Sequence, residues 1–167
     1  MLVHSFDRRS LFRGLGAMVL AAPMSTLAAT GVSDNWRDDP VRRFTDADWR
    51  SKLPSASYAV LRHEATEAPF SSPLNREHRA GTFVCLGCGL PLFKSTWKFD
   101  SGTGWPSFYQ ALPGAFLKKA DFAIGVPRTE YHCARCLGHH GHVFDDGPRP
   151  TGLRYCNNGV ALVFKPG

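Results

Sequence analysis

Two pairs of cysteines constrain the fold of this chain more than any other feature. Cys85 and Cys88 form one Cys-x-x-Cys pair, Cys133 and Cys136 form another, and glycines stand within or just after each pair. Such a tight turn points two sulfur atoms to one side, so two turns complete a tetrahedron of thiolates around one Zn²⁺. Four thiolates leave no open coordination position, which makes the predicted zinc structural rather than catalytic. The long segment between the pairs predicts that the metal joins two sides of a whole domain.

Two other interpretations of these cysteines remain open. Two structural disulfides would suit an exported protein, because they persist in oxidising compartments. A redox-active Cys-x-x-Cys is also possible, although two matched pairs are less typical of it. We favour one structural zinc ion held by four cysteines.

The first 29 residues indicate export. Paired arginines at Arg8 and Arg9 precede an apolar run at residues 15–22 and small residues at 25–29, the order of a twin-arginine-like signal. An uncleaved membrane anchor is the alternative, but the apolar run is short for a hydrocarbon core of about 30 Å. General secretion signals also carry two basic residues before an apolar run, so the route of export stays open. We therefore expect a periplasmic protein without stable membrane insertion after cleavage.

After the signal, we expect a flexible leader at residues 30–44 and a single domain at residues 45–167. Removing residues 1–29 takes away one aspartate and three arginines, which lowers the net charge from +6 to +4. No long Lys/Arg run remains, so a nucleic-acid partner is disfavoured.

The domain should be mainly β. Thr45 is a helix cap followed by acidic residues, and a second short helix is expected from Ser55 to about Glu64. From Gly81 onward, short apolar or alternating runs are separated by Gly, Pro, Asn or Asp, which is typical of strands and turns. The expected strands are 82–85, 90–93, 116–117, 124–126, 129–133, 142–144 and 160–164.

Cys156 is the cysteine left over from the two pairs. A single extra cysteine in an exported protein is a reactive thiol, an intermolecular bridge or a buried inert residue. Arg154 lies two residues earlier, so both side chains face the same side of a strand, and a guanidinium favours the thiolate. Asn157 and Asn158 follow. These polar neighbours favour the reactive thiol.

The sequence His139-His140-Gly141-His142 offers proton donors close to that thiol. The cluster could also be a solvated turn or a catalytic zinc site, which would need a further ligand such as Asp145 or Asp146. We prefer general acids serving Cys156.

Residues 101–108, Ser-Gly-Thr-Gly-Trp-Pro-Ser-Phe, predict a rigid aromatic corner around Trp105. A tryptophan here could simply belong to the core. The functional interpretation is an apolar wall for a substrate methyl group.

Taken together, these motifs resemble the B-type methionine sulfoxide reductases. The resemblance covers about residues 45–166 and rests on five segments in the family's order, together with Thr-Glu-Ala-Pro-Phe at 66–70. The five segments are 85–88, 101–108, 133–136, 139–148 and 152–159.

The resemblance implies a fold of two antiparallel sheets, β-tent-like, with short N-terminal helices and a structural zinc site. It implies reduction of methionine R-sulfoxide, in oxidised proteins by preference, with Cys156 attacking the sulfoxide sulfur and becoming a sulfenic acid. Trp105 would hold the methyl group, and Phe108 joins it as a predicted substrate-binding residue. The remaining catalytic residues implied are His139, His142, Asn158, Arg154 and Asp146.

Three positions depart from the family's usual pattern. His140 stands where the family usually has leucine, and Asn157 where it often has an aliphatic residue. Thr103 occupies a position where many members carry a resolving cysteine. We therefore expect an external thiol reductant, such as a thioredoxin-like protein, to recycle Cys156.

Two other functions compete with this one. A thiol peroxidase could use Cys156, and a zinc-supported β-fold binding module would need no chemistry. Trp105 suits a sulfoxide better than a peroxide, and a pure binding module has no need for Cys156 beside Arg154 and His142.

Overall fold

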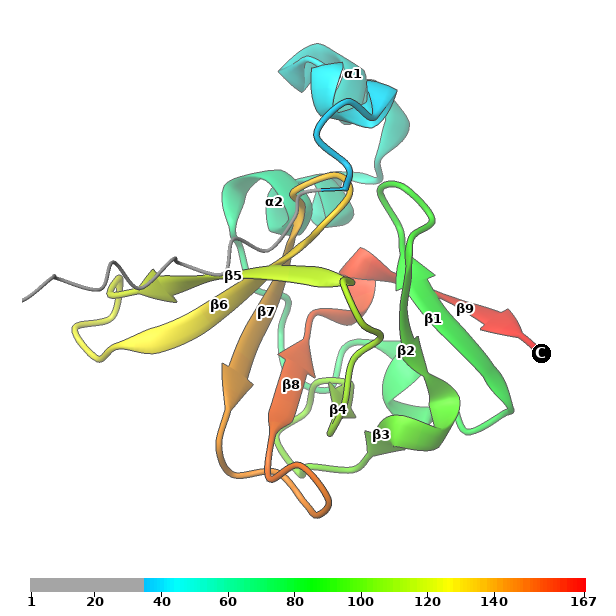
Figure 1. Cartoon of the computed structure of the whole chain (residues 1–167), viewed down its shortest axis with the longest axis vertical. Helices are drawn as coiled ribbons and strands as arrows, with labels where there is room; N and C mark the ends of the chain where they lie inside the picture. The colour runs from blue at the N-terminus through cyan, green and yellow to red at the C-terminus, as the bar shows by residue number, and fades with distance from the viewer. Residues whose placement is uncertain (1–34) are drawn as a thin grey trace, which may run out of the picture. The chain divides into compact units, whose positions relative to one another are not determined.

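The computed structural model of the protein describes residues 35–167, and the predicted signal at residues 1–29 lies outside them. The described part is mainly β, as expected, with two antiparallel sheets (Figure 1). Among these residues, no helix is both long and apolar enough to cross a bilayer.

The smaller sheet has three strands in the order β2-β1-β9, and the larger has six in the order β3-β4-β8-β7-β6-β5. All pairs in both sheets are antiparallel. The strands are β1 (Gly81–Cys85), β2 (Pro91–Lys94), β3 (Lys98–Phe99), β4 (Ser107–Phe108), β5 (Phe116–Asp121), β6 (Arg128–Cys133), β7 (His139–Phe144), β8 (Arg154–Asn157) and β9 (Leu162–Pro166).

Two short helices precede the sheets, α1 (Asp46–Lys52) and α2 (Ser55–His63). Thr45 caps α1 in a reciprocal capping box with Asp48, which satisfies amide groups that a helix start leaves without partners. Pro54 separates the two helices, and Glu64 ends α2 in a left-handed conformation. Both helices therefore begin where the sequence predicted.

Aromatic side chains fill the space between the sheets. Phe93 of the small sheet stacks on Phe108 of the large one, with ring centroids 4.0 Å apart. Tyr131 and Phe116 meet edge to face at 4.6 Å beside them. Such rings bury large apolar areas, so this layer fixes how the sheets pack.

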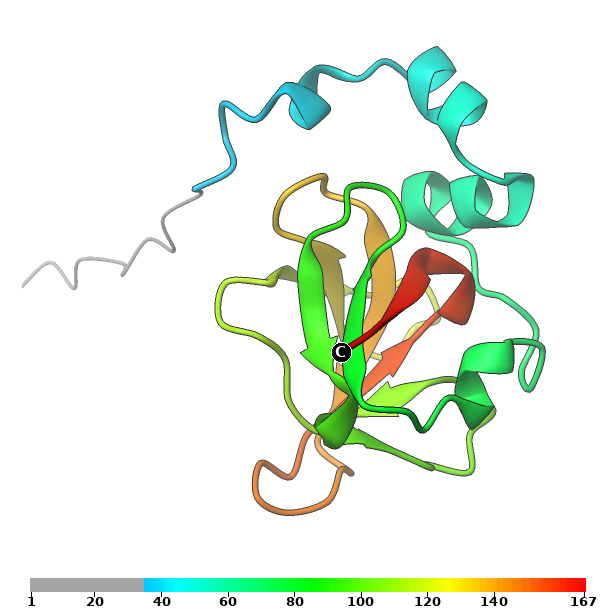
Figure 2. The ribbon, with the colours of Figure 1, turned by 90° about the vertical axis from the view of Figure 1, so that its right-hand side faces the viewer.

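The loops after β1 and β6 carry the two cysteine pairs and lie side by side at the same end of the sheets (Figure 2). In each loop, the residue after the second cysteine has a positive φ, 76° at Gly89 and 61° at Leu137. The two turns thus share a backbone shape, although only the first uses glycine at this position.

Two segments differ from what their sequence indicated. Residues 124–126 form an exposed turn between β5 and β6 rather than a strand, because β5 ends at Asp121 and Gly125 adopts a φ of 76°. Residues 35–44, taken as part of a leader, include the 3-10 helix η1 (Pro40–Arg43) and contact the second cysteine loop.

Candidate active site and metal centre

Cys156 lies at a small cavity beside strands β7 and β8. The cavity has a volume of about 140 Å³, enough for the end of a side chain. It brings together four of the predicted residues, Cys156, Trp105, His142 and Asn158. The other lining residues are Thr66, Arg128, Gly141, Phe144 and Asn157.

Strand register explains which side chains reach this cavity. Cys156 pairs with His142 of β7 and with Ser107 of β4, so these three share one face of the sheet. Tyr155 pairs with Phe108, and both belong to the buried core on the opposite face. Phe108 was predicted to bind the substrate, but it is completely buried, stacks on Phe93 and does not line the cavity. Phe144 lines the cavity instead.

Gly141 allows β7 to approach β8 this closely. A Cβ atom at this position would lie 2.0 Å from the carbonyl oxygen of Cys156. A side chain here would therefore push His142 and Cys156 apart. The close approach of the two strands thus explains why glycine stands at position 141, independently of any acid–base role of the histidines on either side.

Trp105 forms one wall of the cavity. Its indole Nε1 donates to the carbonyl of Glu67 at 3.1 Å, and the preceding Gly104 accepts from the amide of Phe70 at 2.7 Å. Gly104 has a φ of 94°, and a Cβ there would lie 2.8 Å from the Cβ of Pro69. The corner is therefore packed and hydrogen-bonded to residues 67–70, and its tryptophan has a fixed orientation.

Glu67 and Asn158 join that segment to the end of β8. The Glu67 carboxylate accepts from the amides of Gly159 and Val160, at 3.2 Å for the second. Asn158 accepts from the Glu67 amide at 2.9 Å and donates to the carbonyl of His140 at 3.0 Å. The Asn158 carbonyl oxygen and one of its two amide N–H groups are thus bound to backbone groups, which fixes the side chain in the cavity wall. Burial is the main cause that raises the pKa of Glu67.

Arg154 lies next to Cys156, as its spacing predicted. Its guanidinium forms a two-point ion pair with Asp146, with both N–O distances 2.8 Å, and its charge lowers the pKa of Cys156. Burial nevertheless raises the pKa of Cys156, and Arg154 and Thr103 only partly offset this. Arg154 thus acts in the predicted direction and favours the thiolate, while the burial of Cys156, which the sequence did not indicate, opposes it.

We expect Arg154→Met to move the pH midpoint of Cys156 alkylation upward and to slow alkylation near neutral pH several-fold. The variant removes the cation that opposes burial, whereas methionine can still cover Phe144, over which the guanidinium now lies at 4.3 Å. Iodoacetamide labelling against pH measures this directly. Asp146→Asn is the matched control with the opposite sign, because the Asp146 charge raises the pKa of Cys156. If both variants moved the pH midpoint of Cys156 alkylation in the same direction, the charges of Arg154 and Asp146 would not have the opposing effects on Cys156 described here.

His142 is held by a carboxylate that the sequence analysis did not single out. Its Nε2 lies 2.7 Å from Asp121 at the end of β5, and Arg128 pairs with the same oxygen at 2.5 Å. A carboxylate only accepts, so Nε2 carries the proton. The bonds from Ala123, His142 and Arg128 lower the pKa of Asp121. His142 is therefore the histidine presented to the cavity.

The other two histidines lie elsewhere. His139 is buried behind His142, with ring centroids 5.7 Å apart, and bonds Glu130 through Nδ1. Burial is the largest cause lowering its pKa. His140 points away from the cavity, and its Nε2 lies 3.4 Å from the Cys85 sulfur. Burial lowers its pKa to about 3, so His140 does not act as a proton donor to Cys156 near neutral pH.

The four paired cysteines form one cluster, with all sulfur atoms within 4.8 Å of one another. The closest contacts join the two loops, 3.6 Å between Cys85 and Cys136 and 3.5 Å between Cys88 and Cys133. Four thiolates around zinc have sulfur atoms roughly 3.8 Å apart in an ideal tetrahedron. The arrangement is therefore compatible with a structural metal site. Cys156 does not belong to this cluster.

Three arginines bind the carbonyl groups of these loops. Arg42 donates to Ala134 and Arg135 at 2.6 and 2.5 Å, and Arg62 of α2 donates to Cys136 at 3.0 Å. Arg135 crosses to the carbonyl of Cys88 at 3.0 Å. A divalent metal with four thiolates carries a net charge of −2, so these cations also favour the loaded site.

Comparison with known proteins adds to this geometry. The SelR domain model matches residues 53–166. A protein of Bradyrhizobium diazoefficiens, named peptide methionine sulfoxide reductase MsrB, is 54% identical over 130 residues, covering 77% of this chain and 93% of its own length. Proteins of the same name from Pseudomonas putida and Thiobacillus denitrificans are 53% and 51% identical, covering 71% and 73% of this chain and 90% and 93% of their own.

Proposed function

Because the chain belongs to the SelR-domain family of peptide methionine sulfoxide reductases, we propose that it reduces methionine R-sulfoxide in oxidised proteins, with Cys156 as nucleophile. The observation that carries this proposal is the cavity itself. It combines a half-buried thiol, an oriented tryptophan and a carboxylate-held histidine on one side of the sheet.

The proposed reaction transfers oxygen from sulfoxide to cysteine. The Cys156 thiolate attacks the sulfoxide sulfur, the sulfur–oxygen bond breaks, and methionine leaves with two more electrons. Cys156 loses the same two electrons and becomes a sulfenic acid. The oxygen is a poor leaving group unless it is protonated, so the step needs an acid on the oxygen side.

His142 is the best-placed residue to assist that proton transfer. It pairs with Cys156 across the strands, lines the cavity and is oriented by Asp121. Trp105 offers its apolar ring to the methyl group. With the thiol, the aromatic wall and the histidine fixed on different sides, only one epimer can satisfy all three contacts, which supports a stereospecific reaction.

We propose that an external thiol recycles the enzyme. All four other cysteines cluster in the metal site, so none is free to form a disulfide with Cys156. One reductant thiol would displace water from the sulfenic acid, and a second would release Cys156 from the resulting mixed disulfide. A dithiol protein of the thioredoxin type supplies both.

We assign the metal as one structural Zn²⁺ held by Cys85, Cys88, Cys133 and Cys136. All-sulfur donors and the tetrahedral spacing suit zinc. We also propose export through residues 1–29 to a periplasm, where oxidised proteins would be the substrate. The twin-arginine route carries folded proteins, so zinc could load before the thiols meet oxidant.

The test is a single turnover of pre-reduced protein without added reductant, with R and S epimers of a blocked methionine sulfoxide offered separately. We expect about one methionine per chain from the R epimer and none from the S epimer, since one thiol supplies one electron pair. Mass mapping without reductant should then find no bridge from Cys156 to another cysteine.

Thr103→Cys provides a matched variant for this assay. Thr103 lies close enough to Cys156 to lower the pKa of its thiol, so a thiol at position 103 should attack the sulfenic acid, release water and form a disulfide with Cys156. The yield should stay at about one methionine per chain, because a disulfide also accounts for one electron pair, but mass mapping should now find the bridge that the wild type lacks. Product from both epimers, or from neither with the fold intact, would overturn the proposed reaction. Turnover of peroxide alone would favour the thiol peroxidase.

A further inference from the structure

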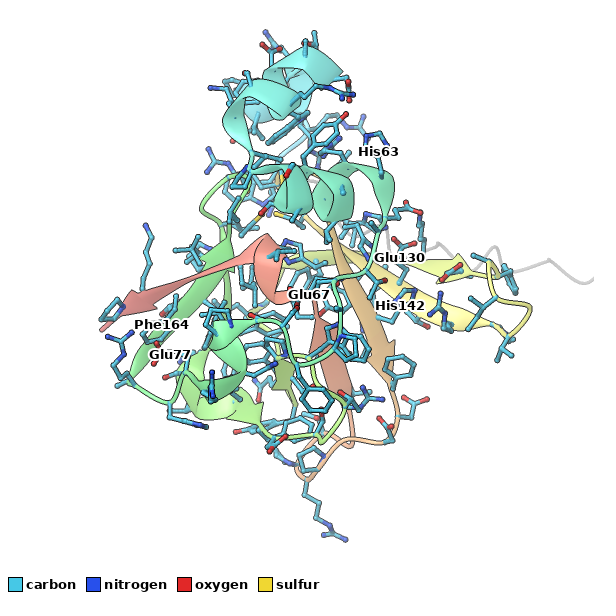
Figure 3. The ribbon with its side chains drawn as sticks, turned by 180° about the vertical axis from the view of Figure 1, so that it is seen from behind. His63, Glu67, Glu77, Glu130, His142 and Phe164 are labelled. Atoms are coloured by element: carbon cyan, nitrogen blue, oxygen red, sulfur yellow. The ribbon has the colours of Figure 1, made fainter. Side chains whose placement is uncertain are left out.

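A second cluster of metal-ligand type lies beside the cavity. Ligand atoms of Glu130, His132 and His139 are all within 4.8 Å of one another. Glu130 is 2% exposed and His139 is 2% exposed, so the cluster is inside the protein. In Figure 3, the labelled Glu130 and His142 lie near one another on neighbouring strands. The proposed reaction uses neither Glu130 nor His132.

The strands bring these residues onto one face. Glu130 and His132 alternate along β6, so both point to the same side, and His132 pairs with His139 of β7 across a bulge. The rings of His132 and His139 are 5.6 Å apart. The carboxylate of Glu130 lies between two imidazoles.

The orientation of His132 points to a missing cation. Its Nδ1 faces the carbonyl of Leu137 at 3.2 Å, and a carbonyl can only accept, so Nδ1 carries the proton. In the neutral ring Nε2 then presents a lone pair, and it lies 2.8 Å from the Glu130 oxygen Oε1. Among the described residues, this buried nitrogen has no hydrogen-bond partner. This ring nitrogen is therefore left without a partner beside a carboxylate, and a cation bound by both groups would supply one.

The remaining contacts resemble the outer support of a metal site. A histidine ligand typically donates its other ring N–H to a backbone carbonyl, as His132 does here. Lys119 holds the other Glu130 oxygen at 3.0 Å and leaves Oε1 for the histidines. Lys119 also pairs with Glu64 at 2.6 Å, so two carboxylates and one ammonium leave a net negative charge.

We propose that Glu130, His132 and His139 bind one divalent transition-metal ion, in addition to the ion of the cysteine cluster. The ligands are Oε1 of Glu130, Nε2 of His132 and Nδ1 of His139. Two imidazoles and one carboxylate are a known zinc set, with ligand atoms roughly 3.4 Å apart in a tetrahedron. The Glu130 oxygen lies 2.8 Å from Nε2 of His132, so the carboxylate would have to move outward to reach that spacing, and a water molecule would complete the fourth position.

Metal binding has a consequence for catalysis that rests on the proposed function. Without metal, Nδ1 of His139 donates to Glu130; with metal, it becomes a ligand and the proton moves to Nε2. His139 packs against His142, with ring centroids 5.7 Å apart, so the ion changes the environment of the cavity's acid. Excess zinc should therefore inhibit turnover reversibly.

The test uses the full chain with zinc already in the cysteine cluster, titrated with Co²⁺. A nitrogen–oxygen site gives weak visible d–d bands, whereas cobalt on four thiolates gives intense charge-transfer absorption. We expect d–d bands alone, saturating at about one Co²⁺ per chain. This readout requires no turnover, so it can fail independently of the proposed function.

His132→Gln should abolish these bands, and His78→Gln, at an exposed position outside the cluster, should retain them. Equilibrium dialysis against Zn²⁺ should agree, with about two ions per chain in the wild type and about one in His132→Gln. No binding beyond one zinc would overturn the proposal and identify His132 as a protonated ion-pair partner of Glu130. Equal binding by both variants, or charge-transfer absorption, would overturn it as well.

Discussion

Replacing Cys156 with serine should lower methionine sulfoxide reduction by on the order of 10³-fold or more. A hydroxyl is far less acidic than a thiol and has no accessible oxidised state equivalent to sulfenic acid, so it can neither attack nor accept the oxygen. The measurement is the single-turnover yield with the R epimer, which should fall below detection.

The fold should survive this change, because serine is nearly isosteric and Cys156 contributes no metal ligand. Zinc content and melting temperature should match the wild type, and iodoacetamide should lose its reactive site. Substantial methionine release by a folded Cys156→Ser protein would exclude Cys156 as the nucleophile.

Replacing Cys133 with serine should have the largest effect on stability. Structural zinc contributes about 10–16 kcal/mol in small zinc domains, while whole domains are stable by only about 5–15 kcal/mol. Cys133 is completely buried at the end of β6, and its loop meets the loop after β1 from the other sheet. We expect loss of zinc and a largely unfolded chain at 37 °C, measured by circular dichroism and metal analysis.

Cys156→Ser is the matched control, since it makes the same chemical change at the one cysteine outside the cluster. Chelator treatment of the wild type should reproduce the effect of Cys133→Ser. A Cys133→Ser protein that melts like the wild type would rule out a structural metal at this position.

Much of the site was predictable because its residues are close in sequence or chemically distinctive. The four cysteines were predicted as one cluster from their matched spacing, and the structure brings their sulfurs together. Arg154 was placed beside Cys156 because residues two apart on a strand share a face. Thr45 began a helix because its hydroxyl and the following acids suit a helix start.

The predictions failed where strand register or contacts between distant parts of the sequence determine which way a side chain points and what it contacts. Phe108 was expected at the substrate, but its pairing with Tyr155 turns it to the core. His140 and His142 are two residues apart, which in a regular strand would place both on one face, but the register shift between β6 and β7 interrupts this alternation at His140. Asp121 and Glu130 were missed because antiparallel pairing, not sequence proximity, brings them to the histidines. Glu67 stood in the segment 66–70, but nothing local indicated its bonds to residues 159 and 160.

Hydrogen bonds between residues distant in the sequence also bear on the order in which the chain folds. Arg42 binds carbonyl groups 92 and 93 residues later, and Glu67 binds amides 92 and 93 residues later. Contacts of such sequence separation carry a large loop-closure cost and form slowly. The segments around Arg42 and Glu67 are therefore synthesised early but should dock late, and Trp105, which donates to Glu67, should gain its fixed position only when the end of β8 is in place. We therefore expect a nascent chain to lack the assembled cavity, so that Cys156, Trp105 and His142 come together only in the finished fold.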